Sequence, residues 1–106
     1  MKVWNEILEF NDKYFPGWRD VSPVYYSNAL AGEVGEICNS VKHFIGGGTN
    51  THNITPVDVA TEGVDALIYL ILLVEKFGID EKMFQLLFEE KMATLVRRME
   101  CNVKES

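Results

Sequence analysis

The chain has 106 residues, of which 47% are hydrophobic and 25% charged, as is usual for a folded domain rather than a disordered chain. Its formal net charge of −6 argues against a polymeric nucleic-acid partner, because proteins that grip a phosphate backbone are normally basic. The N-terminus lacks the long apolar core of a signal peptide, and the apolar run at 66–74 is too short to cross a membrane. Cys38 and Cys101 are isolated, which predicts reduced thiols in a cytoplasmic protein.

The first two predicted helices are separated by a short connection. Apolar residues recur at helical spacing over residues 3–15, and Pro16-Gly17 ends this helix. The second helix begins at Ser22-Pro23, a capping residue followed by proline at the first helical position. It runs to about Ile45, where three glycines stop it.

A polar, glycine-rich segment separates the two halves of the chain. Residues 46–55 predict a loop, and its closeness in sequence to acidic residues suggests a lid. A third helix is expected over about 56–77, after a threonine cap and a proline, and a fourth over about 81–100. The pattern predicts one all-α domain over residues 1–106, with a four-helix bundle-like protomer.

The third helix is apolar on nearly every side between Ala66 and Val74. Four helices of this size would not cover such a surface, and a helix that is hydrophobic all round usually lies inside something larger. We therefore expect a homo-oligomer, either a homodimer or a dimer of dimers, that shares this helix.

Two pairs of carboxylates stand out, Glu33 with Glu36 and Glu62 with Asp65, each at i, i+3 spacing. Spacing alone means little, because the first helix carries the same spacing on its solvated face and acidic residues are usually exposed. Position is more informative, since Glu33 falls in register with the apolar residues of its helix. Asp65 likewise lies on a side that should be packed.

Inward carboxylates are costly unless they are paired or bind a metal, and the inward stripe has no basic residue to neutralise them. Two such pairs on neighbouring antiparallel helices would converge into a site made only of oxygen ligands. That ligand set suits Mg²⁺, or Mn²⁺, rather than zinc. Gly32 and Gly35 beside the glutamates would be explained by close helix approach, by room for a ligand or by chance.

Other side chains could serve a substrate that contains phosphate. The candidate phosphate-binding residues are Lys42, Lys91, Arg97 and Arg98, and the candidate base contacts are Trp4 and Trp18. Each of these lysines and arginines, taken alone, is more often a solvated surface residue. Aromatic residues near helix starts more often belong to the core.

The segments ALAGEVGEI and EGVDALIYLILLVEKFGID, with Lys42 between them, resemble the MazG-like all-α nucleoside triphosphate pyrophosphohydrolases over about residues 18–98. That family carries Glu-x-x-Glu on one helix and Glu-x-x-Asp on the next, as at Glu33/Glu36 and Glu62/Asp65. The resemblance implies Mg²⁺-dependent cleavage between the α- and β-phosphates. Related members often place Asn four residues after the fourth-helix lysine, whereas Leu95 follows Lys91 here, which leaves substrate choice open.

The sequence thus favours a pyrophosphohydrolase in which all four carboxylates bind Mg²⁺ and Glu33 and Glu36 act in catalysis, with Glu36 orienting or deprotonating the attacking water. One alternative is a narrower enzyme on the same scaffold, for dUTP, dCTP or phosphoribosyl-ATP. Another is a non-catalytic helical module whose partner surface is the apolar third helix.

Overall fold

The computed structural model describes residues 2–45 and 53–105, and for residues 103–105 the backbone alone. Its helices are α1 (Lys2–Tyr14), the short 3₁₀ helix η1 (Pro16–Asp20), α2 (Pro23–Ile45), α3 (Pro56–Lys76) and α4 (Glu81–Glu105). The described residues contain no strand, so the all-α prediction is confirmed. None of these helices is long and apolar enough to cross a membrane. The predicted lid at 46–55 falls outside the described residues except for its last three.

Capping residues set the helix boundaries where the sequence predicts them. The Thr55 hydroxyl accepts a hydrogen bond from the backbone N–H of Asp58, and the Asp58 carboxylate accepts one from the Thr55 N–H, which together form a capping box. Gly78 adopts φ +77 just beyond α3, a conformation that suits glycine. The Asp80 carboxylate then accepts from the Met83 N–H and starts α4. Unlike the prediction, α4 continues through the tail to Glu105.

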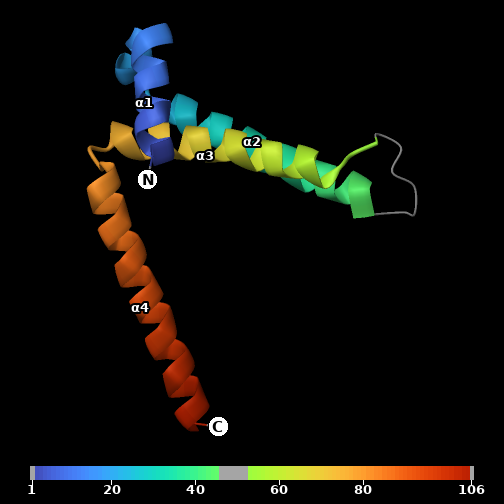
Figure 1. The fold of residues 1–106 in the computed structure, drawn as a ribbon, viewed down its shortest axis with the longest axis vertical. Helices are drawn as coiled ribbons and strands as arrows, with labels where there is room; N and C mark the ends of the chain where they lie inside the picture. Colours follow the sequence, from blue (N-terminus) through green and yellow to red (C-terminus); the bar gives the residue numbers. More distant parts are fainter. Residues whose placement is uncertain (1, 46–52, 106) are drawn as a thin grey trace.

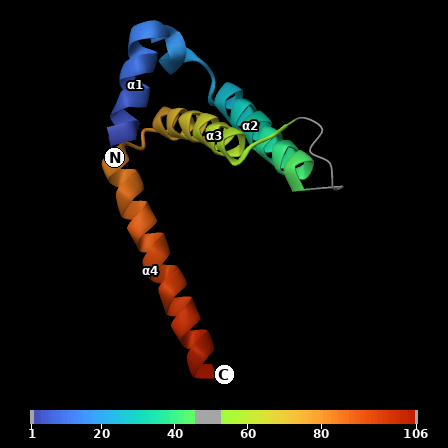
Figure 2. The same ribbon diagram turned by 45° about the vertical axis from the view of Figure 1, so that its right-hand side comes forward.

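Helices α2 and α3 lie side by side and antiparallel as a long hairpin, and α1 crosses one end of it (Figures 1 and 2). The buried core lies at that end and draws one or two residues from each neighbouring element: Trp4, Ile7, Trp18, Tyr26, Ile71 and Leu72. The rest of the hairpin is held mainly by contacts between α2 and α3.

The prediction of a four-helix bundle-like protomer is wrong, because α4 does not pack along the other helices. It leaves the core end of the hairpin and runs away from the other helices (Figure 1). Phe84, in its first turn, packs on Trp4 with 5.2 Å between ring centroids. The other large apolar side chains of α4 as far as Met99 are exposed; they include Leu87, Met92 and Met99. In a four-helix bundle these residues would face the other helices, but nothing in one protomer covers them.

Candidate functional site

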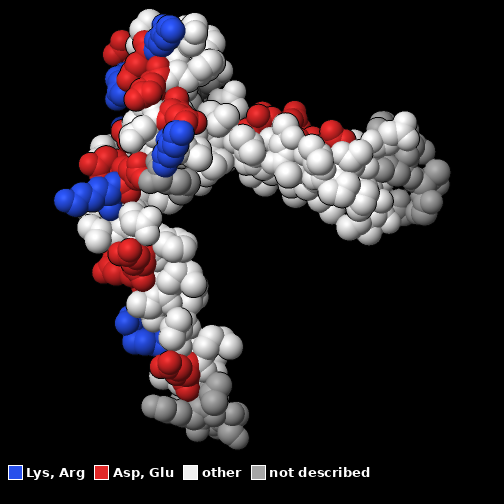
Figure 3. All heavy atoms as spheres, in the orientation of Figure 1, with Lys and Arg blue, Asp and Glu red and all other residues white. Residues whose placement is uncertain are grey.

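The four predicted carboxylates, which we call the carboxylate cluster, come from the two helices of the hairpin: Glu33 and Glu36 from α2, Glu62 and Asp65 from α3. Figure 3 shows acidic side chains gathered along one edge of this hairpin. Glu36 is exposed, whereas the other three are partly buried. The antiparallel arrangement of α2 and α3 therefore brings the two acidic pairs to one side, as the sequence predicts.

Two carboxylate oxygens of this cluster are buried without a hydrogen-bond partner, Oε2 of Glu33 and Oε2 of Glu62. The other oxygen of Glu62, Oε1, accepts a hydrogen bond of 2.8 Å from the hydroxyl of Ser40, which is buried on α2. This bond links the two helices and fixes one end of the Glu62 carboxylate. Buried polar atoms are nearly always satisfied, so the two orphan oxygens mark a place where a donor or cation would be stabilising.

The carboxylate cluster is also strained electrostatically. Burial raises the pKa of Glu33 above its usual range, and the nearby charges of Glu36 and Asp65, a hydrogen bond with Glu36 and the charge of Glu62 raise it further. All these causes oppose a negative charge on Glu33. A bound cation would reverse that balance and favour the ionised form.

The donor chemistry of the cluster fits a hard divalent cation, since every candidate ligand is a carboxylate oxygen and two of these oxygens lack a partner. The side chains are not, however, arranged as a finished site. Within residues 2–45 and 53–105, no group of three or more His, Cys, Asp or Glu side chains is positioned to hold a metal ion. The carboxylates are gathered, but their present placement is not a closed ligand set.

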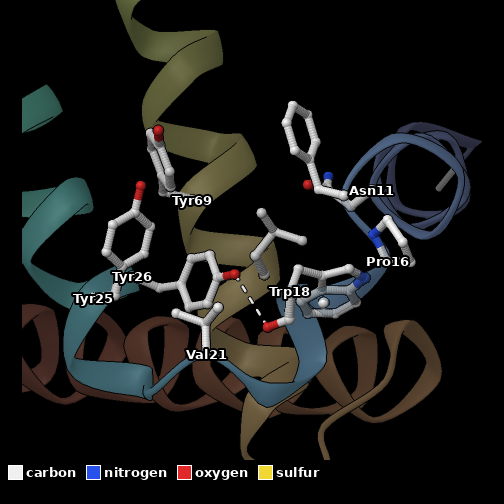
Figure 4. A pocket seen from close by; sticks show the side chains of 10 residues that line it. Asn11, Pro16, Trp18, Val21, Tyr25, Tyr26 and Tyr69 are labelled. Atoms are coloured by element: carbon white, nitrogen blue, oxygen red, sulfur yellow. Dashed lines mark hydrogen bonds between the residues drawn. The ribbon is translucent and has the colours of Figure 1, made fainter.

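An aromatic pocket of about 510 Å³ lies at the core end of the hairpin, between η1 and the helices (Figure 4). Its volume is within the range of small-molecule sites. Its aromatic lining residues are Phe15, Trp18, Tyr25, Tyr26 and Tyr69, and Asn11 is one of its polar lining residues. The hydroxyl of Tyr26 is used internally, because it donates to the backbone oxygen of Trp18 at 3.1 Å.

Tyr69 connects this pocket to the carboxylate cluster. Tyr69 lines the pocket and lies four residues after Asp65 on α3, about one helical turn along the same face. Burial raises the pKa of the Tyr69 hydroxyl, and the charges of Tyr25, Glu33 and Asp65 raise it further. Tyr25 and Tyr69 direct their hydroxyls toward the same region in Figure 4. A planar ligand in the aromatic pocket would therefore lie next to the carboxylates, where any phosphate that it carries could meet a bound cation.

The predicted phosphate-binding residues are not gathered around this site. Lys42 is exposed and lies nine residues after Glu33, about two and a half helical turns, so it lies on the opposite side of α2. Lys91, Arg97 and Arg98 lie on the part of α4 that leads away from the hairpin (Figure 1). Within one protomer, no residue of this predicted group faces the carboxylate cluster.

The two predicted base contacts have different surroundings. Trp18 lines the aromatic pocket, and its ring nitrogen donates to Asp12 at 2.7 Å. Trp4 is only 2% exposed and is not among the pocket's lining residues. Its ring nitrogen donates to Glu75 at 2.7 Å, which makes it a core residue that joins α1 to α3.

Sequence reasoning missed Ser40 and Tyr69 as members of the site. Both carried a usable signal, because Ser40 lies seven residues after Glu33 and Tyr69 lies four residues after Asp65. Residues at these spacings share a helix face with the carboxylate. Both residues could have been found by examining the positions that follow each acidic pair on the same face of its helix.

Gly32 and Gly35 do not mark a close approach between helices in the protomer, because a Cβ at either position would meet no atom within 4 Å. We therefore expect Gly32→Ala and Gly35→Ala each to raise the free energy of unfolding by about 0.5–1 kcal/mol, the usual gain of alanine over glycine within a helix. Urea denaturation followed by circular dichroism measures this gain. A loss of stability in either variant would instead show that another surface packs against this side of α2 in solution.

Comparison of the chain with protein-family profiles, with curated protein sequences and with solved structures finds no match. The function therefore has to be inferred from the residues and geometry of this chain.

Proposed function

We propose that the protein is a Mg²⁺-dependent nucleotide pyrophosphohydrolase that converts (deoxy)nucleoside triphosphates into nucleoside monophosphates and pyrophosphate. The observation that supports this proposal is the position of the carboxylate cluster, with its two unpartnered oxygens, beside an aromatic pocket lined by Tyr69, which follows Asp65 by four residues on α3. The carboxylate cluster suits a cation that could in turn bind phosphates, and the aromatic pocket suits a flat base. The resemblance of the sequence to MazG-like enzymes is consistent with this combination.

Each residue of the cluster has a role in this proposal. Glu33, Glu36, Glu62 and Asp65 would hold the ion, and Ser40 would keep the Glu62 carboxylate oriented through its 2.8 Å hydrogen bond. Bound Mg²⁺ would offset the charge of the triphosphate and polarise the phosphorus under attack. Glu36 is the exposed member, so it is the best placed to orient a water molecule and accept its proton.

The reaction itself is a hydrolysis. The water oxygen forms a bond to phosphorus, the bond to the oxygen that bridges the α- and β-phosphates breaks, and pyrophosphate leaves. Trp18, Tyr25 and Tyr69 would contact the base in the aromatic pocket, because their rings offer apolar surface and the two tyrosines add a hydroxyl each. The base would thus be held in the pocket while the triphosphate extends toward the cluster.

We also propose that the protein is a homo-oligomer, a dimer or a dimer of dimers, in which α3 is shared. Val57 and Val64 on α3 are 72% and 55% exposed in the protomer, and α4 leaves its apolar side chains uncovered. Apolar surface of this extent is unusual on a monomer and normally marks an interface. Light scattering at micromolar concentration should give at least twice the protomer mass of 12.1 kDa.

A panel of nucleoside triphosphates, with dUTP, dCTP and phosphoribosyl-ATP included, tests the activity. We expect pyrophosphate release from at least one of them with Mg²⁺, and loss of this release by at least about 100-fold with excess EDTA, since the ion carries much of the charge stabilisation. Rates should be measured by a coupled pyrophosphate assay and the nucleotide product identified by chromatography.

The pattern across the panel decides between the alternatives. One nucleotide strongly preferred would indicate the narrower enzyme, and similar rates with several bases would indicate a broad one. Release of inorganic phosphate rather than pyrophosphate would contradict the proposed bond cleavage. No reaction with any nucleotide, together with no Mg²⁺-dependent thermal shift, would leave the non-catalytic helical module.

A further inference from the structure

One wall of the aromatic pocket is built by η1 and the residue that leads into it. Phe15, Pro16, Gly17 and Trp18 are consecutive in the chain and all line the pocket, across from Tyr25 in Figure 4. η1 has only five residues, and its N-cap residue is Phe15, whose side chain cannot accept a capping hydrogen bond. So short a helix has little stability of its own. The shape of this wall therefore depends on side-chain contacts with neighbouring elements.

Asp12 on α1 holds two successive residues of η1 with one carboxylate. Its Oδ1 accepts a hydrogen bond of 2.7 Å from the indole N–H of Trp18 and one of 3.1 Å from Nε of Arg19. Its Oδ2 accepts a third bond, of 3.2 Å, from Nη2 of Arg19. The Arg19 guanidinium also lies over the Trp18 ring, 4.4 Å from the ring centroid. Asp12 is not a lining residue of the pocket, so its effect on a ligand would be exerted through Trp18.

The bond to Asp12 decides where the indole of Trp18 lies. Trp18 is 3% exposed, and an indole has a single N–H donor, which Asp12 accepts. The backbone of Trp18 is fixed separately, because its oxygen accepts a hydrogen bond from the Tyr26 hydroxyl. A buried N–H without an acceptor is costly. If Asp12 were removed, we expect the ring to turn toward water and the pocket wall to change shape.

We propose that Asp12 is a positioning residue for nucleotide binding, which acts through the Trp18 indole to keep the aromatic pocket in the shape that receives the base. The inference rests on the proposed function, in which this pocket holds the base. The sequence alone places Asp12 on the solvated face of α1. Hydrogen bonds from Arg19 and then from Trp18 lower the pKa of Asp12, so its carboxylate is ionised at neutral pH and can accept all three bonds.

The exposure of the ion pair separates a positioning role from a general stabilising one. The side chains of Asp12 and Arg19 are 48% and 52% exposed, and ion pairs with such exposure contribute little to global stability. The Trp18 ring is buried, so its orientation depends on whether its N–H has an acceptor. A pocket that must be reordered before a ligand enters binds that ligand more weakly. Loss of Asp12 should therefore weaken nucleotide binding more than it destabilises the fold.

Titration calorimetry with Mg²⁺ and an α,β-imido nucleotide tests this role, because nitrogen replaces the bridging oxygen of the bond proposed to be cleaved. Asp12→Ala should raise Kd by about fivefold or more, and should raise KM similarly with kcat within about twofold of wild type. Its thermal midpoint should fall by no more than about 5 °C. Asp12→Asn should bind nearly as wild type does, since its amide oxygen still accepts from the Trp18 indole. Glu9→Ala, at an exposed position of the same helix, is the matched control.

The opposite results distinguish the failure of this inference from the failure of the proposed function. Wild-type affinity of Asp12→Ala overturns the positioning role, and so does a fall in kcat with unchanged KM, which a loss of folded protein would produce. An Asp12→Asn variant as weak as Asp12→Ala overturns the action through the Trp18 N–H. A wild type that neither binds nor cleaves any nucleotide overturns the proposed function, and the inference with it.

The indole N–H signals in a proton–nitrogen correlation spectrum follow the contact without any activity. The chain has two tryptophans, and each indole donates to a carboxylate at 2.7 Å, Trp18 to Asp12 and Trp4 to Glu75. In Asp12→Ala the Trp18 signal, assigned with Trp18→Phe, should move upfield and exchange faster with water, because a strong hydrogen bond to a carboxylate is lost. The Trp4 signal is the internal control and should stay in place. An unchanged Trp18 signal, or an equal shift of both, overturns the inference.

Discussion

Glu33→Gln is expected to reduce Mg²⁺-dependent pyrophosphate release by at least about 100-fold, because it would remove one of the four carboxylates proposed to bind the ion. The same change should make the metal-free protein more stable at neutral pH. Burial and the charges of Glu36 and Asp65 raise the pKa of Glu33, so its ionised form is unfavourable in the folded protein. Glutamine keeps the shape of the side chain without that charge.

The raised pKa of Glu33 determines how the stability difference between the two proteins changes with pH. Because the pKa of Glu33 is higher in the folded protein than its ordinary value of 4.5, the folded state binds this proton more tightly than the unfolded chain. The contribution of Glu33 to stability is therefore complete below pH 4.5 and is lost as the pH rises through its raised pKa. The Gln variant lacks this loss, so its advantage over wild type should grow with pH and then level off.

Thermal unfolding in EDTA between pH 4 and 8 measures the effect on stability, and the coupled pyrophosphate assay measures the effect on activity. Glu9→Gln is the matched control, since Glu9 is exposed on α1 and should change neither quantity much. Full activity of Glu33→Gln would count decisively against the site. If the thermal midpoint of Glu33→Gln at neutral pH were lower than that of wild type, the proposed electrostatic strain at Glu33 would be contradicted.

Trp4→Ala is expected to lower the free energy of unfolding by about 3–5 kcal/mol, which is a large part of the stability of a domain of this size. Trp4 is 2% exposed, donates a 2.7 Å hydrogen bond to Glu75 and packs on Phe84. Its removal would leave a cavity where α1, α3 and the first turn of α4 meet, and would also free a partly buried carboxylate.

Urea denaturation followed by far-ultraviolet circular dichroism measures this loss without depending on tryptophan fluorescence. Phe10→Ala is the comparison, because Phe10 is 54% exposed and its truncation should cost far less. Trp4→Phe should lie between the two, since it keeps most of the apolar volume and loses the hydrogen bond. If Trp4→Ala kept wild-type stability and only raised KM for nucleotide, the base contact that the sequence suggested would replace the core role.

The parts of the fold that follow from local signals could be predicted from the sequence. The starts of α2, α3 and α4 are set by capping residues next to them in the chain, and the inward position of Glu33 follows from its spacing within α2. The direction of α4 could not be predicted in this way. It depends on the short junction at Gly78 and on how much surface the other helices offer.

Contacts distant in sequence account for the remaining differences. Trp4 reads as a candidate base contact until Glu75, 71 residues away, is seen to accept its hydrogen bond. The aromatic pocket combines Trp18 of η1 with Tyr69 of α3, and periodicity within one helix does not reveal such a pairing. The carboxylate cluster was predictable because Glu33 and Asp65 fall in register with the apolar residues of their own helices, whereas the neighbours of the cluster depend on tertiary packing.

The core lies at one end of the hairpin, and the carboxylate cluster lies beyond it, along the part where α2 and α3 are held mainly by each other. Local opening should therefore begin on the side of the hairpin away from Ile71 and Leu72, and the mutual repulsion of the carboxylates would favour it. A ligand that bridges the two helices binds only the closed form, so part of its binding free energy would be used to close the hairpin. The affinity for such a ligand and the rigidity of this half of the hairpin would then both report on the same opening equilibrium.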